Sequence, residues 1–373
     1  MYILTSTVHE IVNAIEKLDI QKNETVFIML AEQELPDIAY LISELNKRKI
    51  HFIGAIFPGL IYGPKKCNKG AIIFTLPAMQ KPILIQDISN SPHELEKMIQ
   101  PFRSIKKKSS TAFIIVDSQS SNISSFLSSF FNLFADSIEY IGCGAGFLDV
   151  SSRKCIFTPD GFFQDAAIIS FVDMECKLGV HHGWKKAIGP IVVTESDGII
   201  IKELNWRNAF EVYREIVESD FGKKFTGNDF YETSRHYPFG IYTENHEDLV
   251  REVIIASNEG YLICGGDVPE NAVLNILKSD KASQISSAEK ILKDCFSEKD
   301  LHVKYCLVLD CIGRTIYHPK DFEEELVAIS NGLKARNVET IPEGVLSRGE
   351  IASMGEDMIE FLNKTIVVGI FHE

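Results

Sequence analysis

The stretch Ile138-Glu139-Tyr140-Ile141-Gly142-Cys143-Gly144-Ala145-Gly146 leads, after a polar loop, into Ala166-Ala167-Ile168-Ile169-Ser170-Phe171. This pattern predicts a buried strand, a glycine-rich turn, a loop and a second buried strand. Residues 50–74 and residues 338–371 have the same plan, each with glycines in the predicted turn. The chain therefore contains an internal repeat, and a repeat of this kind decides the architecture.

The repeat extends upstream of each of these stretches. Short apolar runs of the buried-strand type lie at residues 25–30, 111–116 and 305–310. Each run is followed by a segment with helical spacing, at residues 35–47, 123–134 and 322–334. We infer at least three strand–helix–strand–turn–strand units, in which the strand after the helix pairs in parallel with the strand before it.

These units predict an α/β protein with two domains of mixed β-sheets flanked by helices, built from duplicated strand–helix–strand–strand units. The length of 373 residues also favours two domains. After the second unit the pattern changes, and Ser196-Asp197-Gly198 predicts a hairpin turn between two apolar runs. We place the domain boundary near Asn205, between residues 1–205 and 206–373, and expect a ligand where the glycine turns of the two domains converge.

The composition is that of an ordinary globular protein, with 45% hydrophobic and 24% charged residues. No apolar run approaches the ~18 residues of a membrane span, and the N-terminus shows no secretory signal, so we expect a cytoplasmic protein. The eight cysteines show no CxxC spacing, which favours buried free thiols. The net charge of -14 argues against a nucleic-acid partner.

Seven short motifs occur in a recognisable order. They are Ile141-Gly142-Cys143-Gly144-Ala145-Gly146, His181-His182-Gly183-Trp184-Lys185, Tyr237-Pro238-Phe239-Gly240-Ile241, Val250-Arg251, Leu309-Asp310-Cys311-Ile312-Gly313-Arg314, Ser347-Arg348-Gly349-Glu350-Ile351 and Asn363-Lys364-Thr365. With them the chain resembles the FIST family, named for F-box and intracellular signal transduction proteins, from about residue 23 to the C-terminus. The resemblance covers both the N-terminal and the C-terminal FIST regions.

The resemblance implies a sensory module that binds small molecules, with amino acids often proposed as ligands and some members linked to haem and nitric-oxide sensing. Two departures from the family pattern mark places where ligand contacts would differ. Lys186-Ala187-Ile188-Gly189 stands where the family often has proline and then glycine, and Leu362 stands where a histidine often precedes the asparagine.

Cys143 and Gly144 lie in the glycine-rich turn of the second unit. In a G-x-S-x-G elbow the nucleophile is the middle residue, which here is Gly144, so Cys143 is one position early. A structural turn is therefore favoured over a catalytic cysteine, and we expect no enzyme activity. The backbone N–H groups of this turn could still receive an anionic ligand group.

His181 and His182 are adjacent, so on a regular strand they point to opposite faces and do not share one ion. We expect His182 to face a ligand pocket beside Trp184, the alternative being a histidine of the surface or the core. A haem would need an axial ligand, and the formal candidates are His182, His181, His236 and Cys311. Their spacing does not choose among them, and no local cysteine–histidine set predicts zinc.

Three arginines, Arg251, Arg314 and Arg348, are candidate anchors for an anion, because arginine pairs bidentately with carboxylates. Glu350 would receive an ammonium group, and together they suit an amino-acid zwitterion. The alternative is a structural salt bridge between Arg348 and Glu350. Asn363, just before the last predicted strand, either contacts the ligand or caps a turn.

These residues lead us to expect a small-ligand-binding sensory protein, not an enzyme, that signals through a separate partner. Family analogy suggests a kinase or a cyclic-nucleotide signalling protein as that partner. The alternatives are a haem-binding nitric-oxide sensor and a structural scaffold or interaction protein.

Overall fold

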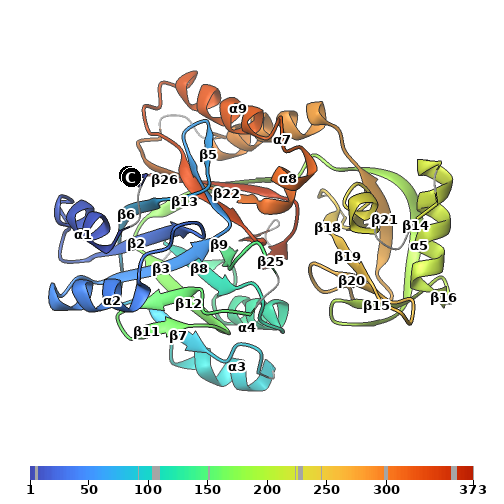
Figure 1. Ribbon diagram of the computed structural model, residues 1–373, viewed down its shortest axis with the longest axis horizontal. Coiled ribbons are helices and arrows are strands. Elements are labelled where there is room, and N and C mark those ends of the chain that lie inside the picture. Colours follow the sequence, from blue (N-terminus) through green and yellow to red (C-terminus); the bar gives the residue numbers. More distant parts are fainter. Residues whose placement is uncertain are drawn as a thin grey trace.

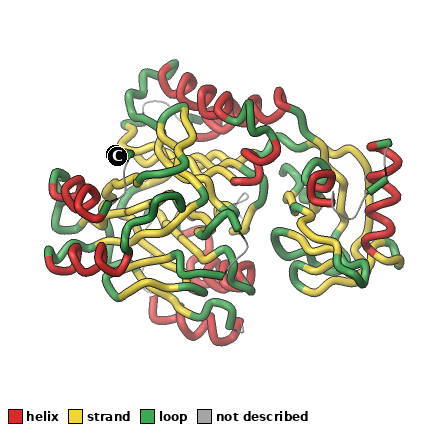
Figure 2. Tube along the Cα trace, viewed as in Figure 1, coloured by secondary structure: helices red, strands yellow, loops and turns green. Residues whose placement is uncertain are grey.

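A computed structural model describes residues 1–4, 7–90, 92–102, 110–149, 152–222, 224–225, 230–244, 246–297, 301–353 and 359–372. The ribbon shows a large body, and beside it a smaller lobe that contains α5 and β14 to β21 (Figure 1). In the body the helices lie on the outside and the strands lie at the centre (Figure 2). The predicted α/β class, with mixed sheets flanked by helices, is confirmed.

Three units of one plan build the body. The first contains β1 (Tyr2–Ile3), α1 (Val8–Glu16), β2 (Glu24–Ala31), α2 (Ile38–Lys47), β3 (Phe52–Phe57), β4 (Gly59–Tyr62), β5 (Lys65–Cys67) and β6 (Ala71–Pro77). The second contains β7 (Ile83–Gln86), α3 (Pro92–Ile99), β8 (Thr111–Asp117), α4 (Ile123–Phe134), β9 (Glu139–Ala145), β10 (Ile156–Thr158), β11 (Gly161–Phe163) and β12 (Ala166–Val172). The third contains β13 (Glu175–His181) and, after the smaller lobe, α7 (Lys281–Cys295), β22 (Val303–Cys311), α8 (Ile312–Tyr317), α9 (Glu323–Lys334), β23 (Glu343–Ser347), β24 (Glu350–Ser353), β25 (Ile359–Leu362) and β26 (Ile366–His372).

Each unit builds most of one six-stranded sheet and lends a hairpin to another. In the first unit β2 pairs in parallel with β3, as expected for two strands joined through a helix. On its other side β2 pairs antiparallel with β6. Its hairpin β4–β5 pairs with β23 of the third unit, while β10–β11 pairs with β3 and β24–β25 pairs with β9. The segments predicted as glycine turns and loops therefore contain hairpins. These hairpins were not predicted from the sequence, because the strands that pair with them lie in another unit.

A glycine occupies the same register in each unit: Gly54 opposite Ile28, Gly142 opposite Ile114, and Gly344 opposite Val308. A Cβ atom on Gly344 would lie 1.8 Å from the carbonyl oxygen of Val308, and one on Gly142 would lie 2.0 Å from that of Ile114. Glycine is thus required where neighbouring backbones approach this closely.

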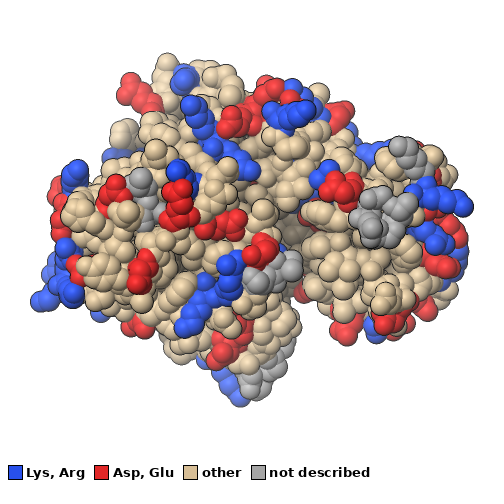
Figure 3. Space-filling view, viewed as in Figure 1, with Lys and Arg blue, Asp and Glu red and all other residues tan. Residues whose placement is uncertain are grey.

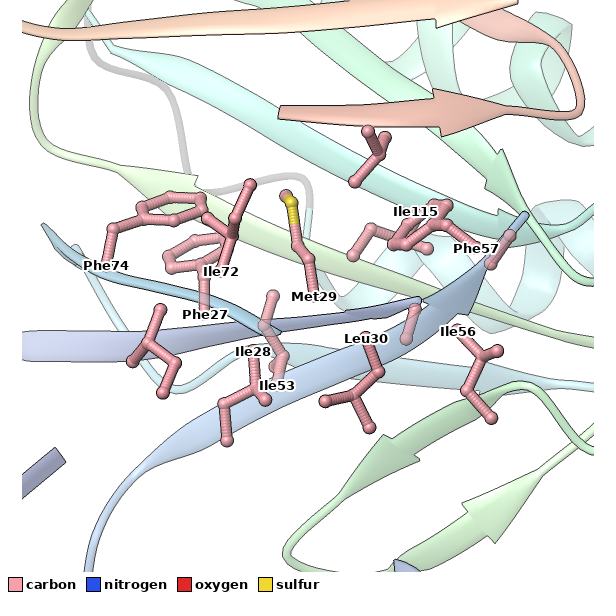
Figure 4. Packing of buried hydrophobic residues seen from close by; sticks show 14 of the residues in the cluster. Phe27, Ile28, Met29, Leu30, Ile53, Ile56, Phe57, Ile72, Phe74 and Ile115 are labelled. Carbon is pink, nitrogen blue, oxygen red and sulfur yellow. The ribbon is translucent and has the colours of Figure 1, made fainter. Parts of the chain in front are cut away.

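The inner faces of the three sheets share one core. Phe27 of β2 packs 4.8 Å from Phe74 and 5.1 Å from Phe113 of the second unit, between ring centroids. Figure 4 shows Phe27 and Met29 from β2 in this core, with Ile115 of β8 nearby. The alternate residues of β8 join a second cluster with the helices α3 and α4 outside the sheet. Alternation along each strand thus separates the core from the helix layer.

The smaller lobe is inserted into the third unit, between β13 and α7. Its elements are β14 (Lys185–Asp197), β15 (Ile200–Leu204), β16 (Arg207–Asn208), α5 (Ala209–Phe221), α6 (Phe230–Ser234), β17 (Phe239–Ile241), β18 (Leu249–Arg251), β19 (Val253–Ala256), β20 (Leu262–Cys264) and β21 (Val273–Lys278). The predicted turn at Gly198 joins β14 and β15. Residues 1–205 and residues 206–373, the two domains predicted from the sequence, each contribute strands to the body and to the smaller lobe.

Candidate functional site

The two lobes are joined by two short crossings, residues 182–184 before β14 and residues 279–280 after β21. Beside them, residues 363–365 between β25 and β26 reach from the body to the smaller lobe. Asn363 Nδ2 donates to the carbonyl oxygen of Gly265 at 3.2 Å, and Arg251 Nη1 donates to that of Phe361 at 3.1 Å. The surface is hollowed between the lobes (Figure 3). We refer to this region as the junction.

Arg314 holds the junction from within the body, where it is fully buried. Its Nη1 donates to the carbonyl oxygen of His182 at 2.6 Å and to that of Lys364 at 3.0 Å, so it binds both a crossing and the 363–365 loop. Its Nη2 lies 2.5 Å from Glu325, and its Nε lies 3.4 Å from Asp310. A ligand carboxylate would have to displace one of these partners, and the ligand role expected for Arg314 stays a prediction.

Arg251 is buried in a similar set of protein contacts. Its Nε donates to the carbonyl oxygen of Asp267 at 2.8 Å, and its Nη2 lies 3.5 Å from Glu360. Its contact with Phe361 crosses from the smaller lobe to the body. Arg251 therefore lies at the junction, with its guanidinium bound to carbonyl groups from both sides.

His182 and Trp184 lie together on the first crossing, as expected. The backbone N–H of Trp184 donates to His182 Nδ1 at 2.8 Å, so Nε2 carries the proton that reaches the carbonyl oxygen of Asp248 at 3.0 Å. Burial lowers the pKa of His182, with Arg314 adding to the effect although Glu247 opposes it. His182 is therefore a neutral imidazole with both nitrogens engaged.

His181 is the last residue of β13, and His182 lies beyond the strand. Both rings contact Glu247, His181 Nδ1 at 3.3 Å and His182 Nε2 at 3.4 Å, so the alternation of strand side chains does not apply to this pair. His181 Nε2 also lies 2.7 Å from Asp294. Burial opposes protonation of His181, but Glu247 and then Asp294 raise its pKa overall.

Cys143 and Glu350 face each other across β9 and β24, inside the body. Both are fully buried, and Glu350 Oε1 accepts from Ser347 Oγ at 2.6 Å. Burial, reinforced by Glu350, raises the pKa of the Cys143 thiol well above its ordinary value. This environment opposes formation of the thiolate that a nucleophilic cysteine needs.

Gly144 is covered as well, because the Phe361 ring packs over the turn. A Cβ atom on Gly144 would lie 3.1 Å from that ring, and one on Gly349 would lie 2.3 Å from it. The N–H of Gly144 donates to the carbonyl oxygen of Gly349 at 2.7 Å. An anion at this turn, which stays a prediction, would require the hairpin β24–β25 to move.

Arg348 points away from Glu350 and binds the loop after β9. Its Nη1 donates to the carbonyl oxygen of Phe147, and at 2.8 Å to that of Asp149. Burial lowers the pKa of this guanidinium although nearby acidic groups oppose the effect. Arg348 thus ties the third unit to the second.

Lys364 and Glu252 lie at the junction, and no ligand role was predicted for either from the sequence. Lys364 Nζ lies 2.6 Å from Glu252 Oε1, and the two side chains are only 1% and 11% exposed. The ammonium group lies 5.4 Å from the Trp184 ring and 5.9 Å from the Tyr317 ring. Tyr231 Oη donates to Glu252 at 3.1 Å. The available signals were Glu252 directly after the motif Val250-Arg251 and Lys364 inside the motif Asn363-Lys364-Thr365.

The haem ligands proposed from the sequence differ in their surroundings. The cavity beside His181 and His182 has room for about one water molecule, so this pair does not fit a haem. Burial raises the pKa of the Cys311 thiol well above its ordinary value. His236 is half-buried, and burial followed by Arg235 lowers its pKa to about 4, which leaves a neutral imidazole for an iron. Across the described residues, no three His, Cys, Asp or Glu side chains group as a metal site.

The structure thus divides the predicted residues into two sets. One set meets at the junction: His182, Trp184, Arg251, Arg314 and Asn363. The other set lies inside the body or on its loops: Cys143, Gly144, Arg348 and Glu350. An amino acid cannot contact both sets without a rearrangement of the β24–β25 hairpin.

Comparison with protein families matches two domain models to the chain. Residues 25–207 match the FIST N domain and residues 209–353 match the FIST C domain. A search of curated proteins found no match. None of the helices in the described ranges combines the length and apolar character needed to cross a membrane. FIST domains are sensory domains of signal transduction and are thought to bind small ligands. With both domains matched in order over most of its length, the chain belongs to the FIST family.

Proposed function

We propose that this protein is a cytoplasmic sensor, not an enzyme, that binds a small polar molecule such as an amino acid at the junction. The observation that carries the proposal is a set of buried polar atoms without partners between the lobes. Within the described residues, Trp184 Nε1 and Asn363 Oδ1 have no hydrogen-bond partner although their side chains are nearly fully buried. Buried polar atoms are rarely left unpaired, so a ligand that pairs them would gain binding energy.

Binding at the junction would change the relative stability of lobe arrangements, because the contacts of Arg251 and Asn363 cross between the lobes. A ligand shifts such an equilibrium only as far as it prefers one arrangement. The signal then passes to a separate protein, for which family analogy suggests a kinase or a cyclic-nucleotide signalling protein. A tagged chain that recovers no such partner from its host would count against this part.

A thermal-shift screen with the twenty proteinogenic amino acids tests the proposal. A ligand at 100 times its Kd stabilises the fold by about 2.7 kcal/mol, which for a chain of this length corresponds to a rise in Tm of about 3 °C. Asn363→Ala should weaken the response. Asn46→Ala is the matched control, because Asn46 Nδ2 also donates to a backbone carbonyl, that of Pro159, but on the surface of the body. If no amino acid raises the Tm, the amino-acid proposal fails.

Haem is the second candidate, and the observation that favours it is the neutral His236 imidazole beside Tyr317, with ring centroids 4.8 Å apart. When bound, haem would supply an iron that binds nitric oxide. An absorbance spectrum of purified protein should show a Soret band that His236→Ala abolishes and His9→Ala does not. A colourless protein that also ignores amino acids would leave the scaffold alternative.

A further inference from the structure

We propose that Lys364 and Glu252 form a charged anchor for an α-amino acid, in which Lys364 takes the ligand carboxylate and Glu252 takes the ligand ammonium. The inference rests on the proposed function and adds to it the two residues that would hold the charged groups of the amino acid. Its starting point is the ion pair itself, which joins the loop before β26 in the body to the residue after β18 in the smaller lobe. The structure thus places one positive and one negative group at the same point of the junction.

The charges of the pair define which ligand could bind between its two members. A buried charge that loses its partner is costly, so a ligand that separates the pair must bring a charge for each of its members. A molecule with only a carboxylate would leave Glu252 unpaired, and one with only an amine would leave Lys364 unpaired. An α-amino acid carries both groups on one carbon and can satisfy both.

Two polar atoms near the ion pair, unpaired in the described part of the chain, could bind the charged groups of the ligand. Trp184, whose ring lies 5.4 Å from Lys364 Nζ, supplies the N–H that has no partner among the described residues. Asn363, the neighbour of Lys364 in the chain, supplies an unpaired oxygen within the same described ranges. One is a donor for a carboxylate and the other an acceptor for an ammonium group.

The backbone of Lys364 has an uncommon conformation and is held by Arg314. Lys364 has a φ of 50°, in the left-handed region that non-glycine residues rarely adopt. Its carbonyl oxygen accepts from Arg314, which also binds the carbonyl oxygen of His182 on the crossing between the lobes. A ligand that moves Lys364 away from Glu252 therefore acts on a loop that shares one buried guanidinium with the crossing. Ligand binding would thereby change the angle between the lobes.

The test compares three related probes on the wild-type protein by isothermal titration calorimetry. For each amino acid that raises the Tm, the decarboxylated amine and the deaminated carboxylic acid are titrated as well. We expect the amino acid to bind at least tenfold more tightly than either single-function analogue. Equal affinity for the acid or the amine would overturn the anchor, because one of the two charges would then be unused.

A double variant tests the residues. Lys364→Met with Glu252→Gln removes both charges and leaves no unpaired ion, and we expect its Kd to rise at least tenfold. The matched control is Lys281→Met with Glu324→Gln, a surface pair also 2.6 Å apart, which should keep the wild-type Kd within twofold. Circular dichroism of the apo double variant checks its fold. If it does not fold, the analogue series on the wild type still decides.

The outcomes separate this inference from the proposed function. If the double variant binds the amino acid with unchanged Kd, the ligand lies elsewhere, so the sensor proposal stands and the anchor falls. If the wild type binds none of the twenty amino acids, the amino-acid proposal itself fails. Small-angle scattering of the wild type with and without ligand should show a change in radius of gyration. An unchanged scattering curve would overturn the predicted change between the lobes.

Discussion

The first and third units place different side chains on the same backbone. Phe57-Pro58-Gly59-Leu60 of the first unit corresponds in register to Ser347-Arg348-Gly349-Glu350 of the third. At the end of the preceding parallel strand, Leu30 corresponds to Asp310. One unit is apolar where the other carries two acids, an arginine and a hydroxyl.

The second unit has the same fold with apolar residues at two of these positions, so the acids are not needed to form the unit. Ile156 occupies the place of Glu350, and Val116 occupies that of Asp310. The polar version occurs in the unit that carries the inserted lobe and contributes Arg314 and Lys364 to the junction. The difference indicates that packing explains what the units share. Of the additional polar groups of the third unit, Asp310 contacts Arg314 at the junction, whereas Arg348 binds the loop after β9 of the second unit.

Replacement of the glycine that the units share should cause the largest loss of stability. It tests whether the units pack in the same way. Gly344→Ala places a Cβ atom 1.8 Å from a backbone oxygen, so the parallel strands must separate. We expect a loss of about 5 kcal/mol in the free energy of unfolding, measured by urea denaturation, and a similar loss for Gly142→Ala.

Gly222→Ala is the control for this prediction. Gly222 has a φ of 72° but open space around its missing Cβ, so only backbone strain of about 1 kcal/mol is expected. A loss at Gly344 no larger than at Gly222 would show that the strands adjust without cost, and the glycines would not mark a common packing rule.

The charged cluster of the third unit should give the next effect. Arg314→Met leaves Glu325 and Asp310 buried without their cation, and we expect a loss of about 3–4 kcal/mol by urea denaturation. Asp310→Leu imitates Leu30 of the first unit and should change stability by only about 1 kcal/mol. The carboxyl oxygens of Asp310 accept no hydrogen bond from the described residues, and burial raises the pKa of this group well above the ordinary value, so its charge is poorly compensated. A larger loss for Asp310→Leu than for Arg314→Met would show that the acid, not the arginine, organises the cluster.

Local patterns predicted the elements, but not the pairings between units. The helical spacing of residues 123–134 matches α4, because its apolar positions face the sheet of its own unit. The strand β4 has no such local signal, since its partner β23 lies more than 280 residues away along the chain. In the sequence Lys364 appears only as part of the motif Asn363-Lys364-Thr365, and no role was predicted for it. It is buried, and its partner Glu252 comes from the smaller lobe, which local sequence patterns do not place.

Glu350 should give the smallest effect, and one that depends on pH. Burial raises its pKa well above the ordinary value despite the hydrogen bond from Ser347. A carboxyl group with a raised pKa in the folded state holds its proton longer than in the unfolded state, so the protein loses stability as pH rises from the unfolded value towards the folded one. Glu350→Leu, which imitates Leu60, removes this loss. The variant should be no more stable than the wild type near pH 4 and about 1–2 kcal/mol more stable near pH 7, by urea denaturation across the pH range. Glu339→Leu, at an exposed position, should leave the pH profile unchanged. If Glu350→Leu is less stable at every pH, the carboxyl group is required for the fold, and the third unit differs from the first in its packing as well as in its contact with the smaller lobe.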